Sequence, residues 1–219
     1  MNNKSIQSIV KLAARKRLIN FARYMQPNFV VEPFHAIYYE ILDRFAHGKI
    51  KKLIIQQPPQ HGKSEGSSRK LPAFILGLNP DKKICIGSYA STIARDFNRD
   101  VQRIIDTKSY RELFPNTFLN GSNAVTMANT YLRNSDVIEM VGHKGSLRVV
   151  GRGGSLTSKT VDISILDDVY KDYAEGNSPI VRESAWKWYT NVVRTRLHND
   201  SQELIVFTRW HDDDLIGRI

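Results

Sequence analysis

Short apolar runs alternate with longer segments of helical period along most of the chain. The runs of strand length span residues 51–57, 82–88, 161–168 and 203–208. Apolar positions between these runs recur with helical spacing and predict helices over 63–78, 91–105 and 179–197. The segment 109–148 is rich in Asn, Ser and Thr and predicts only short strands. This alternation predicts an α/β fold with a mainly parallel central sheet flanked by helices on both faces.

The first fifty residues show helical period only. Apolar residues interspersed with Lys and Arg predict a basic amphipathic helix over about 5–25. A second helix is predicted from about 33 to 47, where prolines precede it and Gly48 ends it. We therefore expect a small N-terminal helical region, residues 1–50, followed by a core that spans residues 51–219.

Composition narrows the class of protein. With 219 residues, 41% of them hydrophobic, the chain is long enough for one large domain with a sizeable core. No apolar stretch approaches the roughly 18–20 residues that cross a bilayer. The first twenty residues lack the apolar centre of a secretory signal, so we expect an intracellular protein without a membrane anchor. The sequence stops within the predicted start of a helix near Asp212, and we expect a longer protein cut to its first domain.

The charge balance bears on partners. Lys and Arg outnumber Asp and Glu by 32 to 22, which gives a net charge of +10. Nucleic acid is the commonest polyanion that binds such a protein, because each neutralised phosphate releases counterions. A generally basic surface without a nucleic-acid partner is the alternative.

A phosphate-binding loop is predicted directly after the first strand. Residues 57–64 read QPPQHGKS, in which Gly62, Lys63 and Ser64 match the end of the P-loop pattern and Gln57 replaces its first glycine. In such a loop, backbone N–H groups surround the phosphates, the lysine binds the β- and γ-phosphates, and the serine hydroxyl binds Mg²⁺. An ordinary strand-to-helix turn is the alternative, although a lysine at a helix N-terminus is unfavourable without an anion. The predicted loop contacts to nucleotide are Gln57, Pro58, Pro59, Gln60, His61, Gly62, Lys63, Ser64 and Glu65.

A second candidate site lies at the end of the third predicted strand, where ISILDD turns abruptly from apolar to acidic. A P-loop ATPase needs one carboxylate to hold Mg²⁺ and another group to orient the attacking water. We assign the metal to Asp167 and the water to Asp168. Many ATPases place a glutamate at the second position, and aspartate is one methylene shorter. The alternative is that the two aspartates only cap a loop. Together with the P-loop, they predict an ATPase that uses ATP and Mg²⁺.

Five segments together resemble the ATPase domain of the large terminase subunits of tailed bacteriophages. They read PPQHGKSE, SYASTIARDFNRDVQRII followed by FPNTFL, GRGGSLTSKTVDISILDDVYKD, WKWYTNVVRTRL and IVFTRWHDDDLIGRI. The resemblance runs from about Gln26 to Arg218, and the segments occur in the family's order. It implies a P-loop NTPase fold of the RecA/ASCE type.

The resemblance also implies a function. Such proteins form a homo-oligomeric ring on the procapsid and use magnesium ATP to drive double-stranded DNA into it. The implied partners are therefore double-stranded DNA, the portal protein and the small terminase subunit, and we expect a monomer when the chain is isolated. The place of action would be the host cell cytoplasm. The family's C-terminal nuclease domain is absent from this sequence, so we expect no nuclease activity.

The resemblance assigns roles to further residues. Lys63 and Ser64 match the phosphate and magnesium positions, and Thr208 matches the coupling motif that senses the γ-phosphate and links hydrolysis to movement. Arg152 lies where the family places an arginine that reaches a neighbouring subunit's nucleotide, and Arg148 is the other candidate. The alternative for Arg152 is a loop arginine that contacts DNA or solvent.

The resemblance also places adenine recognition ahead of the P-loop. Phe34 would stack on the base and His35 would stand where many relatives have glutamine; a core phenylalanine and a surface histidine are the alternatives. Many relatives carry an arginine inside the P-loop, at positions that Gln60 and His61 fill here. This departure gives more weight to an arginine from a neighbouring subunit.

Two other functions remain open at the level of sequence. A helicase-like DNA translocase would have the same fold but a function other than DNA packaging. An ATP-binding assembly module, with little turnover when isolated, would need its neighbour's arginine for hydrolysis.

Overall fold

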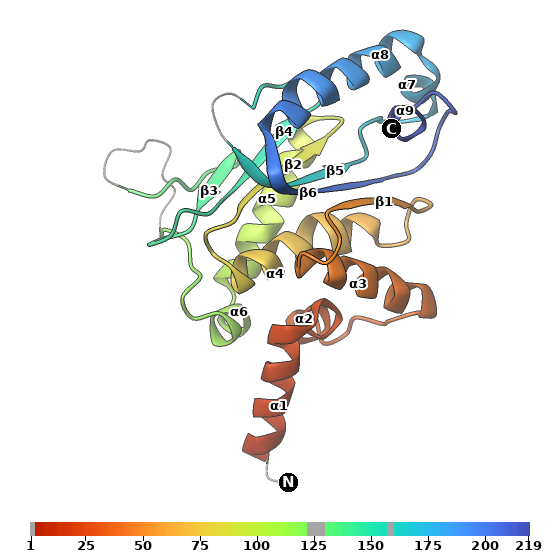
Figure 1. Cartoon of the computed structure of the whole chain (residues 1–219). Helices are drawn as coiled ribbons and strands as arrows, with labels where there is room; N and C mark the ends of the chain where they lie inside the picture. The colour runs from red at the N-terminus through yellow and green to blue at the C-terminus, as the bar shows by residue number, and fades with distance from the viewer. Residues whose placement is uncertain (1–2, 122–129, 157–159) are drawn as a thin grey trace.

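A computed structural model of the chain describes residues 3–121, 130–156 and 160–219. Within these residues, six strands form one central sheet, and helices lie on both of its faces (Figure 1). The predicted α/β class is confirmed. In this described part, none of the helices is both long and apolar enough to span a membrane.

The sheet is parallel except for one outer strand. Its strands are β1 (Lys52–Gln56), β2 (Lys83–Ser88), β3 (Val137–Glu139), β4 (Ser146–Gly151), β5 (Val161–Asp167) and β6 (Leu197–Phe207). They lie in the order β1-β6-β5-β2-β4-β3, and only β3 runs antiparallel to its neighbour. The four predicted strands are all present. The last of them begins at Leu197 instead of 203, because Leu197 already pairs with Val161 across an irregularity in the register.

Side chains on β6 explain why the strands are continuous apolar runs in the sequence. Leu204 and Val206 face the larger core, while Ile205 and Phe207 face the smaller one, and all four are buried. A strand buried on both faces needs apolar residues at every position, as in parallel sheets between two helical layers. This arrangement puts polar site residues at the strand ends.

Two helical layers supply the rest of the two cores. The α-helices are α1 (Asn3–Lys16), α2 (Leu18–Met25), α3 (Pro33–Ala46), α4 (Leu71–Leu78), α5 (Ser91–Asp106), α6 (Lys108–Leu113), α7 (Tyr173–Asn177), α8 (Pro179–Trp188) and α9 (Leu215–Arg218). Figure 1 shows α3 and α4 below the sheet and α8 above it. Residues of α1 to α3 share the larger core with α4 and with the sheet, so the N-terminal helices pack directly onto the rest of the fold.

The single helix predicted over residues 5–25 is wrong. Arg17 is extended, with φ −133° and ψ 128°, and separates α1 from α2. The cause is Asp43 of α3, whose carboxylate accepts a hydrogen bond from the Leu18 amide at 2.7 Å and pairs with Arg17 at 3.1 Å. A buried carboxylate from another helix therefore begins α2, and local periodicity does not reveal it.

Other helix predictions need smaller corrections. The helix predicted over 63–78 has a π-helical turn, Glu65–Lys70, before α4. The helix predicted over 179–197 is α8 followed by a π-helical turn, Tyr189–Val193, and a 3₁₀ turn, Arg194–Arg196. The last helix begins at Leu215, because Asp214 is its N-cap.

Candidate active site

Three predicted site segments meet at one edge of the sheet. Parallel strands end at the same edge, so the loops after β1, β5 and β6 lie side by side. In the strand order, β6 lies between β1 and β5. The segment that starts at Thr208 therefore emerges between the P-loop and the two aspartates, Asp167 and Asp168.

Lys63 connects these three segments. Its Nζ atom lies 2.9 Å from the Asp168 carboxylate and 3.4 Å from the Thr208 hydroxyl, and only 9% of its side chain is exposed. The Thr208 hydroxyl in turn donates to the Gln57 carbonyl at 3.1 Å. The first residue of the loop, its lysine and the residue after β6 thus form one hydrogen-bonded unit. An ammonium group held in this position at the mouth of a phosphate loop suits a polyphosphate ligand.

The loop backbone has the conformation that anion binding requires. Gln60 and Gly62 both have positive φ, 63° and 74°. Turns that contain left-handed residues direct successive N–H groups into an anion-binding concavity. Helical structure begins at Lys63, and the first turn of a helix carries N–H groups without intrahelical partners. The loop therefore offers both of the backbone features that hold phosphate.

Asp167 fits a magnesium site. It is fully buried, its Oδ2 atom accepts from the Ser68 hydroxyl at 2.5 Å, and its Oδ1 atom has no hydrogen-bond partner among the described residues. Burial raises the pKa of Asp167 to about 6; the Ser68 hydrogen bond opposes this, Asp168 adds to it, and Ser64 and Lys63 oppose it. Magnesium takes oxygen ligands from carboxylates, hydroxyls and waters. The Asp167 carboxylate, which has one unpartnered oxygen, and the Ser64 side chain that interacts with it supply oxygen ligands of this kind.

Asp168 has an unusual backbone. Its φ of 47° lies in the left-handed region, which a residue other than glycine seldom adopts. The two neighbouring strands hold it there, because its amide donates to the Val206 carbonyl at 3.0 Å and its carbonyl accepts from the Tyr89 amide at 2.9 Å. Such strain is typical of functional sites. Here it directs the carboxylate toward Lys63.

The residues predicted to bind the adenine base lie against the P-loop. The rings of Phe34 and His35 are 4.0 Å apart, and the Phe34 ring is 5.5 Å from that of His61. A Cβ atom on Gly62 would stand 3.4 Å from the His35 ring. Phe34 is 39% exposed, so the alternative of a core phenylalanine is wrong. Adenine stacking by Phe34 stays a prediction, now with a suitable position.

The structure adds residues that the sequence prediction missed. The Lys63 carbonyl accepts from the Tyr38 hydroxyl at 2.5 Å and from the Ser67 hydroxyl at 2.8 Å. Gly66 leaves room for Tyr38, because a Cβ atom there would lie 2.5 Å from the tyrosine ring. The run of small residues one turn after the P-loop lysine, GSS, was the available signal.

The two arginine candidates are both engaged within the chain. Arg152 donates to the Glu175 carboxylate at 2.9 Å and to the Val169 carbonyl at 2.8 Å, and 15% of its side chain is exposed. Arg148 lies on β4, 3.9 Å from Glu139. A role in a neighbour's nucleotide site stays a prediction for either residue, and for Arg152 it requires the contact with Glu175 to break.

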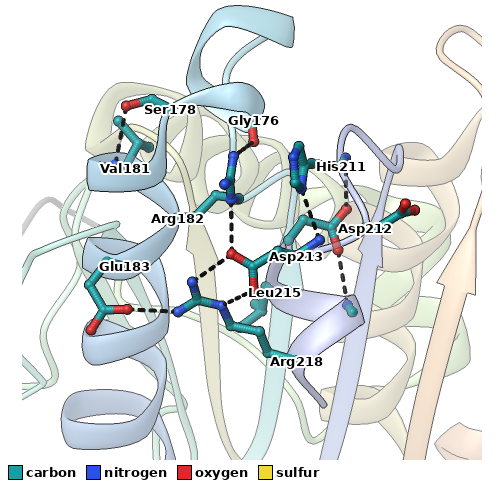
Figure 2. Close-up of polar contacts among 12 residues, drawn as sticks. Gly176, Ser178, Val181, Arg182, Glu183, His211, Asp212, Asp213, Leu215 and Arg218 are labelled. Carbon is teal, nitrogen blue, oxygen red and sulfur yellow. Dashed lines mark hydrogen bonds and ion pairs between the residues drawn. The ribbon is translucent and has the colours of Figure 1, made fainter.

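The segment after Thr208 is fastened to α8 (Figure 2). Asp213 accepts from the Arg218 guanidinium at 2.8 Å and from Arg182 at 3.2 Å, and Arg218 also donates to Glu183 of α8 at 2.8 Å. Arg182 is itself buried. Hydrogen bonds from Arg218 hold the pKa of Asp213 well below its usual value. These contacts hold the segment after Thr208 against α8.

Asp214 is expected to hold this segment in its fold. Its carboxylate is fully buried, accepts from the Arg209 guanidinium at 2.8 Å and caps α9 by accepting from the Gly217 amide at 3.0 Å. Because Asp214→Ala removes the helix cap and the buried carboxylate that pairs with Arg209, we expect a loss of about 2–3 kcal/mol in the free energy of unfolding, measured by urea denaturation. Asp212→Ala is the matched control, since that exposed side chain points away from the network, and we expect a change within about 0.5 kcal/mol. Equal losses in both variants would contradict the capping role.

Comparisons with known proteins identify a family and related folds. The family model described as terminase large subunit, T4likevirus-type, N-terminal, matches residues 54–216. Among solved structures, the large terminase of bacteriophage HK97 superposes with a TM-score of 0.56 at 15% identity, covering 93% of this chain and 40% of that one. A point mutant of the large terminase ATPase domain of Thermus phage P74-26 gives a TM-score of 0.48 at 18% identity, covering 88% of this chain and 70% of that one. No curated protein matches the sequence.

Proposed function

Because the chain belongs to the family of T4-like terminase large subunits and matches its N-terminal part, we propose that it is a magnesium-dependent ATPase whose turnover drives double-stranded DNA into a procapsid. The observation that supports this most is the placement of Lys63 between Asp168 and Thr208 at the mouth of the P-loop. The chain spans only 40% of the HK97 large terminase, so the packaging activity is proposed for the whole assembly of which this domain is the motor.

The chemistry is mainly positioning and charge stabilisation. Lys63 and the loop N–H groups would bind the phosphates of ATP, and Ser64 with Asp167 would hold magnesium. Magnesium, when bound, neutralises charge on the β- and γ-phosphates. Lys63 exchanges its carboxylate partner for phosphate, and Asp168 is then free to orient the attacking water in line with the γ-phosphate.

Coupling to movement would start at Thr208. Its hydroxyl is bonded to the loop carbonyl of Gln57 and lies close to Lys63, which supports a role in sensing the loss of the γ-phosphate. The segment that follows is fixed to α8 through Asp213 and its two arginines. We propose that movement passes along this route.

The partners follow from the family. We propose that the domain acts on double-stranded DNA, as part of a homo-oligomeric ring that docks on the portal protein and cooperates with the small terminase subunit. The net charge of +10 suits a DNA-handling surface. The proposed place of action is the host cell cytoplasm.

A second candidate, an ATP-binding assembly module with little turnover when isolated, is favoured by one observation. Arg152 is paired with Glu175 inside its own subunit, so an arginine for the transition state would have to come from a rearranged neighbour. The helicase-like alternative has no such support here, and an assay for strand unwinding separates it from the terminase proposal.

Turnover should depend on both magnesium and assembly. We expect the purified chain to hydrolyse ATP with Mg²⁺ and to stop when EDTA is added, because Asp167 and Ser64 then lack the cation that they hold. If an arginine acts between subunits, turnover per subunit rises with protein concentration. ATP hydrolysis in EDTA would contradict the metal assignment, and brisk turnover that is independent of concentration would contradict the arginine from a neighbour.

A further inference from the structure

A π-helical turn follows the P-loop and carries two buried serines. The turn spans Glu65–Lys70, and both Ser67 and Ser68 are 0% exposed. Its ends are joined by an ion pair of 3.0 Å between Glu65 and Lys70, and Lys70 is itself buried. π-Helical turns are rare and occur frequently at functional sites. The question is what this turn contributes beside the P-loop residues already described.

Ser68 contacts the carboxylate at the end of β5. Its hydroxyl donates to Asp167 Oδ2 at 2.5 Å. The neighbouring hydroxyl of Ser67 does something different, because it donates to the Lys63 carbonyl at 2.8 Å. Ser68 therefore contacts the acidic end of β5, while Ser67 contacts the backbone at the start of its own helical segment.

The two oxygens of Asp167 are thereby made unequal. Oδ2 is occupied by Ser68, whereas Oδ1 is buried and has no partner among the described residues. Ser64 and Ser68 are four residues apart on one helical segment, a spacing that puts both on the same face. The helical face that would present Ser64 to the metal therefore also carries Ser68, which holds the Asp167 carboxylate in place.

We propose that Ser68 is a positioning residue for magnesium: it holds one oxygen of Asp167 so that the other is directed at the cation beside Ser64. This inference rests on the proposed function. In this role Ser68 would act through Asp167 and not by contact with nucleotide or metal; its Oγ atom also lies 3.2 Å from the Ser67 Oγ atom, within the same turn. Residues that orient a metal ligand in this way typically change metal affinity by about 10–100-fold when they are removed.

The test measures metal affinity instead of turnover. Mn²⁺ binding to the purified chain is followed by electron paramagnetic resonance in the presence of a non-hydrolysable ATP analogue. We expect Ser68→Ala to weaken Mn²⁺ binding by about 10–100-fold, because Asp167 loses its orientation. Affinity for a fluorescent ATP analogue in EDTA should stay unchanged, since Ser68 does not contact the nucleotide.

Matched variants separate positioning from packing. Ser164→Ala removes a different buried serine hydroxyl, on β5, which has no partner in the described part of the chain, and should leave Mn²⁺ affinity unchanged. Ser68→Thr and Ser68→Val have nearly the same shape and differ in the hydroxyl, so the threonine variant should bind Mn²⁺ more tightly than the valine variant.

The outcomes are distinguishable. Unchanged Mn²⁺ affinity in a folded Ser68→Ala chain, or equal affinity in the threonine and valine variants, overturns the role of Ser68. A wild-type chain that binds no nucleotide with Mn²⁺ overturns the proposed function itself.

Discussion

Replacing Lys63 with alanine is expected to lower ATP turnover by at least about 10²–10³-fold, the range seen when one preorganised donor to a developing charge is removed. Lys63 is the buried cation at the phosphate loop, and its Nζ atom already lies within 3.4 Å of both Asp168 and Thr208. The variant removes the proposed donor to the phosphates and the hydrogen bond to Thr208 together. Steady-state release of phosphate measures the effect.

A lysine outside the site provides the control. Lys51 is exposed, lies just before β1 and pairs with Asp200 at 3.1 Å, so Lys51→Ala should leave turnover unchanged. Circular dichroism checks that both variants fold. Turnover retained in a folded Lys63→Ala chain would refute the P-loop assignment.

Asp168→Asn should separate catalysis from binding. We expect kcat to fall by about 10²–10⁴-fold, the usual contribution of a positioned acid or base, while KM for ATP does not rise. Asparagine removes the charge that orients the water, but it tolerates the left-handed backbone that Asp168 adopts at φ 47°. Alanine at this position would add backbone strain and confuse the result.

The comparison variant is Asp200→Asn, which removes a carboxylate exposed at the opposite edge of the sheet and should keep both kinetic constants. If Asp168→Asn raised KM and left kcat intact, Asp168 would act in binding and the water-orienting role would be wrong. An equal fall in both variants would indicate a general effect of charge.

Much of the fold could be predicted from local pattern. All four predicted strands exist, because an apolar run of strand length between helical segments has few other stable arrangements. The helix break at Arg17 could not be predicted in this way. It depends on Asp43, a residue 25 positions from Leu18 that becomes its neighbour only when α3 packs against α2.

The candidate site likewise has parts that could be predicted from the sequence and parts that could not. The P-loop and the acidic pair were identifiable because their chemistry is carried by adjacent residues. The run GSS could draw attention to Ser68, but its contact with Asp167 was not identifiable, since nothing along the chain near Ser68 points to a residue 99 positions away. The inward pairing of Arg152 with Glu175 was equally invisible in the glycine-rich segment around it.

The amino-acid sequence by itself determined the class of fold and indicated the candidate phosphate loop and the acidic strand end, because periodicity and loop chemistry are properties of a few consecutive residues. The tertiary structure decided which of these parts meet. The strand order β1-β6-β5 brings Thr208 next to Lys63, although the two residues are 145 positions apart in the sequence. It thereby joins the loop after β1, the segment after β6 and the acidic end of β5 in one candidate site. Such contacts depend on how the sheet pairs and how helices pack on it, which no short segment encodes.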